Sequence, residues 1–372
     1  MASISFLLLS TFILFSRLCY GHLSLPEDYV ALFIFGDSTV DAGNNNYINT
    51  TTSFQANFWP YGETFFGFPT GRPSNGRLIP DFIAEFAELP LIPPCKQPYL
   101  HQFAKGVNFA SAGAGVLVET FQGLAIDLKT QVAYFKEVRN SLKKQLGEEK
   151  AERLLARAVY LFSIATNDYL SPFLSNSSNY FSYPREAYVG MVIGNLTAAI
   201  QEVYKIGGRK FGFVNMAPWG CVPLAKALNQ ANNGECIEEL KKSVNLHNIA
   251  LPKALQELER KLNGFSYSNF DLYTSLWKRM NNPAEYGFKE GKSACCGSGP
   301  YRGINSCGGK RGVKEYELCG NPNEYVFFDS GHPSEMAYQQ FARLMWSGDK
   351  NVVWPCNLKA LFGAEADAKH VA

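Results

Sequence analysis

The sequence has no excess of charge of either sign. Its 372 residues include 35 Lys and Arg against 33 Asp and Glu, a formal net charge of +2 at pH 7. Nucleic-acid binding needs a concentrated basic surface, so this balance, with no long run of like charge, excludes that class of function. Only 18% of residues are charged and 46% are hydrophobic. This composition excludes a disordered, collagen-like or coiled-coil protein and predicts a globular protein with a substantial core.

Metal-ligand patterns are also missing. The chain contains only five histidines, scattered along its length, and none of its nine cysteines forms a CxxC pair. Structural zinc sites are usually built from such closely spaced pairs. We therefore expect neither a metal ion nor another cofactor.

A membrane-spanning run is absent as well. The apolar stretch from Ile4 to Phe15 is shorter than the roughly 20 residues that a spanning helix needs. It matches the apolar region of a secretory leader, and Cys19-Tyr20-Gly21 supplies small residues at a cleavage position. We predict a signal peptide over residues 1–21 and a mature form without an integral membrane segment; a short membrane anchor is the alternative. Extracellular release, or storage in a vacuole, follows.

Cysteine usage fits this secretory address. Loss of Cys19 with the leader reduces the nine cysteines to eight, an even number that is typical of a disulfide-bonded extracellular protein. The pairing cannot be deduced from spacing, although Cys221 and Cys236 flank a short Gly- and Asn-containing segment and form a plausible local pair. The remaining cysteines are Cys95, Cys295, Cys296, Cys307, Cys319 and Cys356. The Asn-X-Ser/Thr glycosylation acceptors are Asn49, Asn176 and Asn195.

Hydrophobic patterning indicates an α/β fold. A continuous apolar run at residues 30–35 predicts a strand buried on both faces, and it stops at Gly36-Asp37. Long amphipathic helical stripes alternate with such runs, which is typical of a doubly wound, mostly parallel sheet. The other expected strands are 106–110, 159–164, 210–214 and 265–270, and the helical stripes span 132–146, 189–203 and 240–262. We expect one domain over residues 22–372, with a Cys-rich, disulfide-tied surface segment at about 281–324.

Ser38 stands where this fold places its ligands, at the carboxyl end of the first strand. A serine hydroxyl needs a nearby base to act as a nucleophile, usually a histidine that a carboxylate orients. His22 borders the leader and His370 lies in the tail, while His247 falls on an apolar helical stripe and is expected in the core. His101, in a polar loop, has no assigned role.

The best candidate base is His332, which follows Asp329 by three residues after an aromatic-rich run. In a helical turn this spacing puts both side chains on one face, so the carboxylate can hold one ring nitrogen while the other faces Ser38. Pro333 suits the first turn of a helix expected over 335–346. The plainer interpretation is a helix cap with an incidental histidine.

Acyl transfer also requires donors for the oxyanion that develops on the substrate. The second expected strand runs into NFASAGAG, where Gly113 can present a backbone N–H, and the third runs into IATND, where Asn167 offers an amide. Alone, the first is an ordinary turn and the second an ordinary helix cap. Their common position after neighbouring strands, as with Ser38, favours the functional interpretation.

These motifs make the chain similar to the plant-type GDSL esterase/lipase family of the SGNH hydrolase superfamily. Four blocks match in the family's order: FGDSTVDAGNN with Ser38, GVNFASAGAG with Gly113, ATND with Asn167, and DSGH with Asp329 and His332. The segments PYGETFFGFPTGRPSNGR and CCGSGPY extend the resemblance over nearly the whole mature chain. An α/β-hydrolase is disfavoured because Ser38 lies near the N-terminus without a GxSxG motif.

The resemblance implies a three-layer α/β/α sandwich of flavodoxin-like topology. It also implies a nucleophilic system of Ser38, His332 and Asp329, and an oxyanion hole of Ser38, Gly113 and Asn167. The expected function is a secreted serine esterase or lipase acting on a small acyl ester or lipid through an acyl-serine intermediate. Plant members of this family also include acyltransferases, which is the alternative; a non-catalytic binding glycoprotein is the third. Substrate specificity and oligomeric state are not encoded in these motifs.

Two further features have open interpretations. Aromatic residues are crowded between the Ser38 block and the GRPSNGR loop, and they either line an acyl pocket or pack that loop onto the sheet edge. Arg72 and Arg77 either recognise a carboxylate or, as we favour, tie the loop down. The aromatic residues are Phe54, Phe58, Trp59, Tyr61, Phe65, Phe66 and Phe68.

Overall fold

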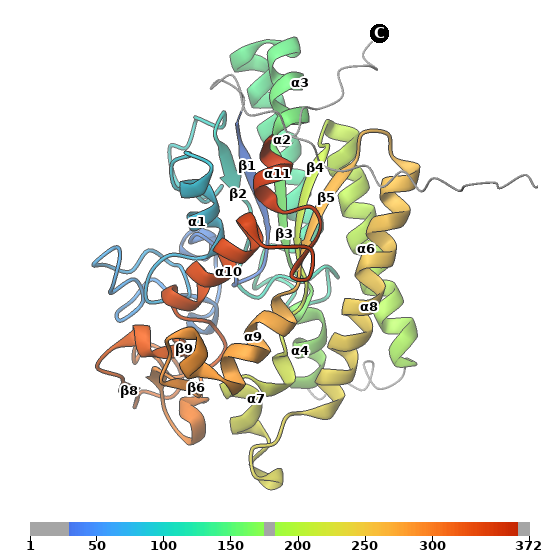
Figure 1. The fold of residues 1–372 in the computed structure, drawn as a ribbon. Coiled ribbons are helices and arrows are strands. Elements are labelled where there is room, and N and C mark those ends of the chain that lie inside the picture. The colour runs from blue at the N-terminus through green and yellow to red at the C-terminus, as the bar shows by residue number, and fades with distance from the viewer. Residues whose placement is uncertain (1–29, 175–182, 364–372) are drawn as a thin grey trace, which may run out of the picture.

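The computed structural model describes residues 30–174 and 183–363, and a six-stranded sheet lies at its centre (Figure 1). The strand order is β10-β5-β4-β3-β1-β2, and every neighbouring pair is parallel except β10 with β5. The predicted mostly parallel sheet is thereby confirmed, and β10 is an addition. The strands are β1 (Leu32–Gly36), β2 (Gly106–Asn108), β3 (Val159–Ser163), β4 (Lys210–Val214), β5 (Ser266–Phe270) and β10 (Val353–Pro355).

The interior of the sheet is dominated by aromatic side chains. Every residue of β1, β3 and β4 is buried, which explains the apolar runs in β1 and β3. Phe35, Phe162 and Phe213 stack across these three strands, with ring centroids 4.8 and 5.5 Å apart. Large rings on adjacent strands bury much apolar surface, and the strand register is thereby fixed.

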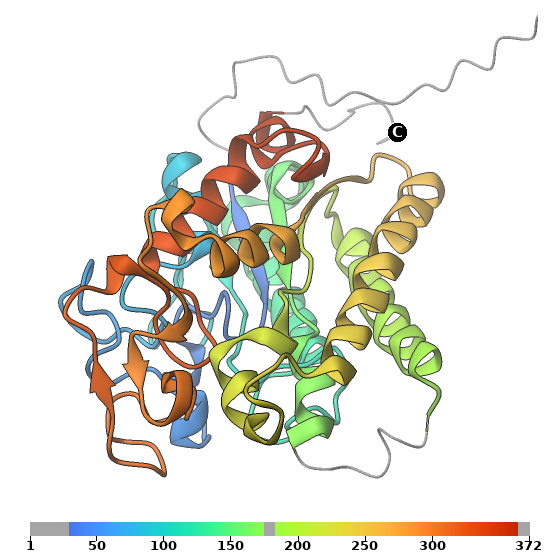
Figure 2. The same ribbon diagram turned by 60° about the horizontal axis from the view of Figure 1, so that its bottom comes forward.

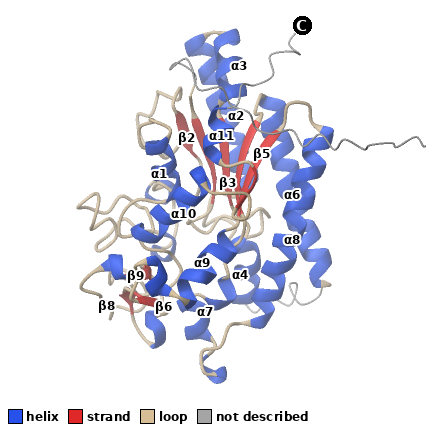
Figure 3. Cartoon of the chain, viewed as in Figure 1, coloured by secondary structure: helices blue, strands red, loops and turns tan. Residues whose placement is uncertain are grey.

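Helices cover both faces of the sheet, so the expected three-layer α/β/α sandwich is confirmed (Figures 1 and 3). On one face α1 packs with α10, and α11 contacts β4 and β5; on the other α2 packs with α6, and α6 with α8. Within the described residues, none of the helices is long and apolar enough to span a bilayer. The helices are α1 (Ile79–Phe86), α2 (Leu128–Leu146), α3 (Glu148–Arg157), α4 (Thr166–Leu174), α6 (Arg185–Ile206), α7 (Pro223–Leu228), α8 (Glu238–Lys261), α9 (Leu272–Asn281), α10 (Glu335–Ser347) and α11 (Leu358–Gly363).

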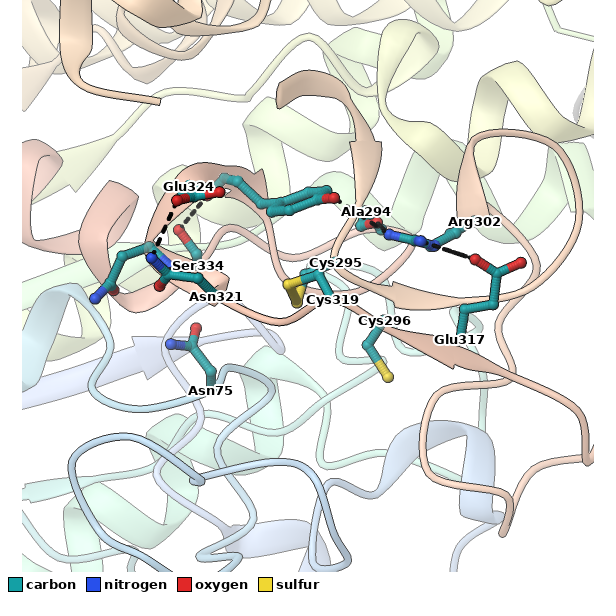
Figure 4. Close-up of a disulfide and its surroundings, with 12 residues drawn as sticks. Asn75, Ala294, Cys295, Cys296, Arg302, Glu317, Cys319, Asn321, Glu324 and Ser334 are labelled. Atoms are coloured by element: carbon teal, nitrogen blue, oxygen red, sulfur yellow. Dashed lines mark hydrogen bonds and ion pairs between the residues drawn. A yellow bond between two sulfur atoms is a disulfide. The ribbon is translucent and has the colours of Figure 1, made fainter. Parts of the chain in front are cut away.

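The Cys-rich segment forms a small separate layer of two short sheets. In Figures 1 and 2 it lies, in orange, beside the blue loops that follow β1. One sheet pairs β6 (Glu290–Ala294) with β9 (Tyr325–Phe327), and the other pairs β7 (Cys296–Gly297) with β8 (Glu317–Leu318). Two disulfides cross-link it, and Figure 4 shows the surroundings of one of them. The disulfides of the described chain are Cys295–Cys319, Cys296–Cys307 and the predicted Cys221–Cys236.

Cys95 and Cys356 take no part in these three disulfides. Cys95 Sγ lies 3.3 Å from Asn44 Oδ1, and Cys356 Sγ lies 3.4 Å from the Tyr267 carbonyl oxygen. Cys95 is a free thiol, so the even cysteine count does not mean here that every cysteine forms a disulfide.

Candidate active site

Ser38 lies in a tight turn two residues beyond β1, at the carboxyl edge of the sheet. The turn is tied to the next strand: the Asp37 N–H donates to the Ser163 carbonyl at 3.0 Å, and Thr39 Oγ1 lies 2.9 Å from Ser163 Oγ. Gly36 is required just before it, because a Cβ there would lie 2.4 Å from the Ser163 carbonyl oxygen. The turn thus holds the serine hydroxyl, which is half-buried, above the sheet edge.

The loop after β9 brings His332 to Ser38. Nε2 of His332 lies 2.8 Å from Ser38 Oγ, and Nδ1 lies 2.8 and 3.0 Å from the two carboxylate oxygens of Asp329. The His332 side chain is 19% exposed and that of Asp329 only 3%. A hydroxyl, an imidazole and a buried carboxylate therefore form one continuous hydrogen-bonded chain.

The backbone between Asp329 and His332 is not the helical turn that the spacing suggested. It consists of bends, and Asp329 Oδ1 accepts the backbone N–H groups of Gly331 and His332 at 3.0 and 2.8 Å. Helix α10 begins only at Glu335, with Ser334 as its N-cap, so Pro333 precedes the helix. The expectation about Pro333 was wrong because the carboxylate, not a helical ladder, closes this turn.

The carboxyl groups around His332 have opposite electrostatic environments. Burial by itself raises the pKa of Asp329, but the charge and hydrogen bond of His332, the charge of Arg311 and the Gly331 N–H outweigh it and hold that pKa well below its usual range. At Asp37 burial outweighs the hydrogen bonds from Thr39 and the charge of His332, and it raises the pKa of this carboxyl to about 6. Asp329 is therefore a carboxylate at neutral pH and can hold the proton on Nδ1, which leaves Nε2 to accept one.

The glycine-rich loop after β2 approaches the same edge. Gly113 has a φ of +88°, and a Cβ there would lie 3.0 Å from the Phe54 ring. The loop is held by Asp41, whose Oδ2 accepts the Ala112 N–H at 2.9 Å, and by Asn45, whose Nδ2 donates to the Ala112 carbonyl at 2.9 Å. Both holding residues come from the segment after Ser38, so the nucleophile turn and the glycine loop are built as one unit.

Asn167 lies in the first turn of α4, directly after β3. It is 7% exposed, and its amide nitrogen donates to the Ala114 carbonyl at 2.9 Å. An amide NH₂ has two hydrogens, so one remains for a ligand. The neighbouring Asp168 does not cap its own helix; its carboxylate accepts the N–H groups of Val116 and Leu117 at 2.8 and 2.9 Å.

Asp41 and Asp168 are the functional residues that sequence reasoning missed. Both are completely buried, and burial raises the pKa of each to about 6 against the hydrogen bonds that lower it. The only available signal was local: Asp41 precedes Gly43-Asn44 at the spacing of an Asx turn. Their bonds to the glycine loop join residues about 50 to 70 positions apart, which local spacing does not reveal.

Members of the aromatic run have two different surroundings. Phe54 lies against Gly113, whereas Phe58 and Tyr61 are buried in a cluster with the Cys-rich segment. The two arginines have structural partners, as expected: Arg72 forms a buried two-point ion pair with Asp81, and Arg77 binds Glu335 and Glu85.

Other residues singled out in the sequence lie away from Ser38. His247 is 1% exposed, in the core as predicted, with Nδ1 2.9 Å from the Tyr169 hydroxyl. The exposed His101 contributes a backbone carbonyl to Gln145. Asn49 and Asn195 are exposed, while Asn176 and the predicted signal peptide lie outside the described residues. Across residues 30–174 and 183–363, His, Cys, Asp and Glu side chains form no group of three suited to a metal ion.

Comparison with known proteins places the chain in a family. A family model described as GDSL-like Lipase/Acylhydrolase matches residues 32–345. GDSL esterase/lipase 2 of Arabidopsis thaliana is 56% identical over 342 residues, 91% of each chain. The GDSL lipase of Tanacetum cinerariifolium is 49% identical over 369 residues, 98% of this chain and 97% of its own. Another Arabidopsis relative, named inactive GDSL esterase/lipase-like protein 25, is 38% identical over 355 residues, 95% of this chain and 80% of its own. The family resemblance deduced from the four sequence blocks is confirmed: this chain belongs to the GDSL-like lipase/acylhydrolase family.

Proposed function

We propose that this protein is a carboxylic ester hydrolase that acts through an acyl-serine intermediate on Ser38. The observation that carries the proposal is the geometry at His332, with Ser38 Oγ 2.8 Å from Nε2 and Asp329 Oδ1 2.8 Å from Nδ1. Membership of the lipase/acylhydrolase family supports ester hydrolysis as the reaction.

In the first half-reaction, Ser38 Oγ attacks the ester carbonyl carbon while His332 Nε2 takes the hydroxyl proton. The bond between the carbonyl carbon and the alcohol oxygen then breaks, and the imidazolium returns the proton to the departing alcohol. In the second half, water attacks the acyl-serine with His332 again as base, which releases the acid and restores Ser38. Asp329 stays ionised throughout and stabilises the imidazolium.

The developing oxyanion would be stabilised by the backbone N–H groups of Ser38 and Gly113 and by the side-chain amide of Asn167. Preorganised donors act strongly on charge that appears only in the transition state. The anchors Asp41 and Asp168 support this assignment, since each ties the Gly113 loop through backbone N–H groups. A rigid loop cannot move its donors away as the negative charge forms.

The proposed address is extracellular. Cleavage after residue 21 would leave one hydrolase domain over residues 22–372 with glycans on Asn49, Asn176 and Asn195. Three disulfides in the described chain support this, because such bonds persist in oxidising compartments.

The test uses the full chain secreted with its own leader, a fluorophosphonate probe and p-nitrophenyl esters of increasing acyl length. We expect the probe to label the wild type but not Ser38→Ala, and ester turnover to disappear with the labelling. The N-terminal sequence of the product should begin at His22. Wild-type turnover in a clean Ser38→Ala preparation would refute the assignment.

The same preparation distinguishes the other two functions. With an alcohol added as acceptor, we expect free acid to dominate over the new ester; dominant ester formation would make the protein an acyltransferase. A folded wild type that neither reacts with the probe nor turns over any ester would be a non-catalytic member, as the name of the inactive relative illustrates for the family.

A further inference from the structure

A buried tyrosine and a buried arginine lie behind the carboxylate of Asp329. Tyr61 Oη donates to Asp329 Oδ2 at 2.7 Å, and Arg311 Nη2 donates to Tyr61 Oη at 2.9 Å. Tyr61 is 0% exposed, Arg311 3% and Asp329 2%. The hydrogen-bonded chain from Ser38 thus continues beyond the carboxylate to a guanidinium.

The chemistry of the donors fixes the direction of every proton in this chain. A guanidinium has no acceptor, so the Tyr61 oxygen must accept from Arg311 and the Tyr61 hydroxyl hydrogen must point to Asp329. Burial raises the pKa of Tyr61 far above its usual value, so the hydroxyl keeps that hydrogen. Asp329 Oδ1 is occupied by two backbone N–H groups and Oδ2 by Tyr61. The carboxylate is consequently held at both oxygens and cannot rotate away from the imidazole.

Charge balance also links the three groups. A buried guanidinium without a counter-charge is costly, and the groups that accept hydrogen bonds from Arg311 within the described residues are neutral: the Ser53 and Gln55 carbonyls at 2.7 and 3.0 Å and the Tyr61 hydroxyl. Asp329 feels the positive charge of Arg311, which contributes to its low pKa. The opposite charges of Arg311 and Asp329 therefore face one another across the Tyr61 hydroxyl.

The two supporting residues come from the regions that the catalytic chemistry left unexplained. Tyr61 belongs to the aromatic run, where its ring packs edge-on against Phe58 and Phe328. Arg311 lies between Cys307 and Cys319 in the sequence. Cys307 is bonded to Cys296 and Cys319 to Cys295. The disulfides thus hold the cation at the rear of the site.

We propose that Tyr61 and Arg311 are positioning residues that orient and charge-balance Asp329, and that the disulfide-bonded segment therefore belongs to the active site. This inference rests on the proposed function, because it takes Asp329 and His332 as the orienting and basic groups. Neither residue touches the reacting atoms.

Other titratable groups face Asp329 and His332. Asp37, from the turn after β1, interacts with His332, and burial raises its pKa to about 6. Tyr338, from α10, faces Asp329 and Asp37, and burial holds its pKa well above the usual value. Asp37 and Tyr338 are unchanged in the variants described below. Any difference in pH profile from the wild type therefore reports on the positioning of Asp329 by Tyr61 and Arg311.

The decisive variant is Tyr61→Phe, which removes one oxygen and keeps the ring. We expect kcat on a p-nitrophenyl ester to fall about tenfold with KM within about twofold. Without the Tyr61 hydroxyl, the Asp329 carboxylate stabilises a protonated imidazole more strongly. The acid limb of kcat/KM should therefore move to higher pH by about half a unit. Arg311→Met should move it in the same direction, since a nearby positive charge opposes the imidazolium, and Arg311→Lys should restore part of the shift.

The chain offers a matched control pair in the same segment. Tyr325 packs against the same cluster, and its hydroxyl accepts from Arg302, which binds Glu317 (Figure 4). Tyr325→Phe and Arg302→Met should leave both kcat and the acid limb within error of the wild type. A purely structural role for the segment would affect both pairs alike and would leave the pH limb in place.

A folded Tyr61→Phe protein with the kcat and pH profile of the wild type would overturn the proposed positioning role. A Tyr61→Phe protein in which only KM changed would overturn it as well. Thermal melts establish folding, and Tyr61→Phe decides alone if Arg311→Met does not fold. Ser38→Ala is measured alongside. If Ser38→Ala is inactive and Tyr61→Phe is unaffected, only the positioning role of Tyr61 and Arg311 is refuted. If Ser38→Ala is active, the proposed function itself is refuted.

Discussion

His332 and His247, both within the described residues, have surroundings that differ in the ways that matter for catalysis. His332 is partly exposed and has a carboxylate on Nδ1 and a serine hydroxyl on Nε2. His247 is 1% exposed, with a tyrosine hydroxyl on Nδ1, and burial lowers its pKa to about 3. The Asp329 carboxylate can stabilise a positively charged imidazole at His332, whereas burial keeps the His247 ring neutral. The contrast shows that the neighbours, not enclosure alone, make a histidine a usable base.

The largest expected effect separates the two histidines by activity. His332→Ala should lower kcat by roughly ten-thousand-fold, because it removes the proposed general base of Ser38 and leaves the proposed oxyanion donors. His247→Gln should stay within about threefold of the wild type. Initial rates with a p-nitrophenyl ester measure both. If the two substitutions reduced kcat equally, the comparison would fail.

Stability at acid pH should separate them in the opposite sense. The folded pKa of His247, about 3, lies below the ordinary value of 6.5, so its contribution is complete above about pH 6.5 and is lost as pH falls toward 3. Denaturant unfolding should show His247→Gln losing about 3 kcal/mol less than the wild type between pH 7 and pH 4.

Three buried carboxyls act in the other direction and make the variant comparison necessary. Burial raises the folded pKa of Asp37, Asp41 and Asp168 to about 6. Their protonation therefore favours the folded state as pH falls from about 6 to about 4, and their contribution is lost as pH rises through 6. Because they are present in both proteins, they cancel in the difference. An identical pH slope in wild type and His247→Gln would contradict the neutral, buried histidine.

The strands and the local blocks of the site could be predicted from the sequence. β1 and β3 are buried on both faces, so their apolar runs are nearly continuous and end where the polar blocks begin. Parallel strands bring their carboxyl ends to one edge, and for that reason Ser38, Gly113 and Asn167 could be assigned to one region before any coordinates.

What the sequence did not reveal depends on encounters between distant segments. Arg311 and Tyr61 are 250 residues apart, and nothing in either local pattern indicates the other. The spacing of Asp329 and His332 predicts a helical turn, because spacing alone does not distinguish i,i+3 packing from an Asx-type turn. The pairing of Cys295 and Cys296 was likewise undetermined, since adjacent cysteines have no preferred partners by spacing.

Two asparagines, one in each region, sharpen the comparison further. In the proposed oxyanion hole Asn167 supplies its second amide hydrogen, so Asn167→Ala should lower kcat about a hundredfold with little change in KM. Asn248 follows His247, and its side-chain amide forms two hydrogen bonds with the Met216 backbone. Oδ1 accepts the Met216 N–H and Nδ2 donates to the Met216 carbonyl, both at 2.9 Å. Asn248→Ala should therefore reduce the free energy of unfolding and leave kcat within about threefold. Equal kcat losses in the two variants would remove Asn167 from the oxyanion hole.

The smallest expected effect concerns the partner of His247. Tyr169→Phe removes the hydroxyl 2.9 Å from Nδ1 and leaves a buried ring nitrogen without that bond, so the free energy of unfolding at pH 7 should fall by about 1 kcal/mol. Because α4 also carries Asn167, a kcat loss below about threefold is expected, and a larger loss would mean that the Tyr169–His247 contact positions the amide. In that event the two histidine regions would be coupled through α4, and the separation between a catalytic and a structural histidine would no longer hold.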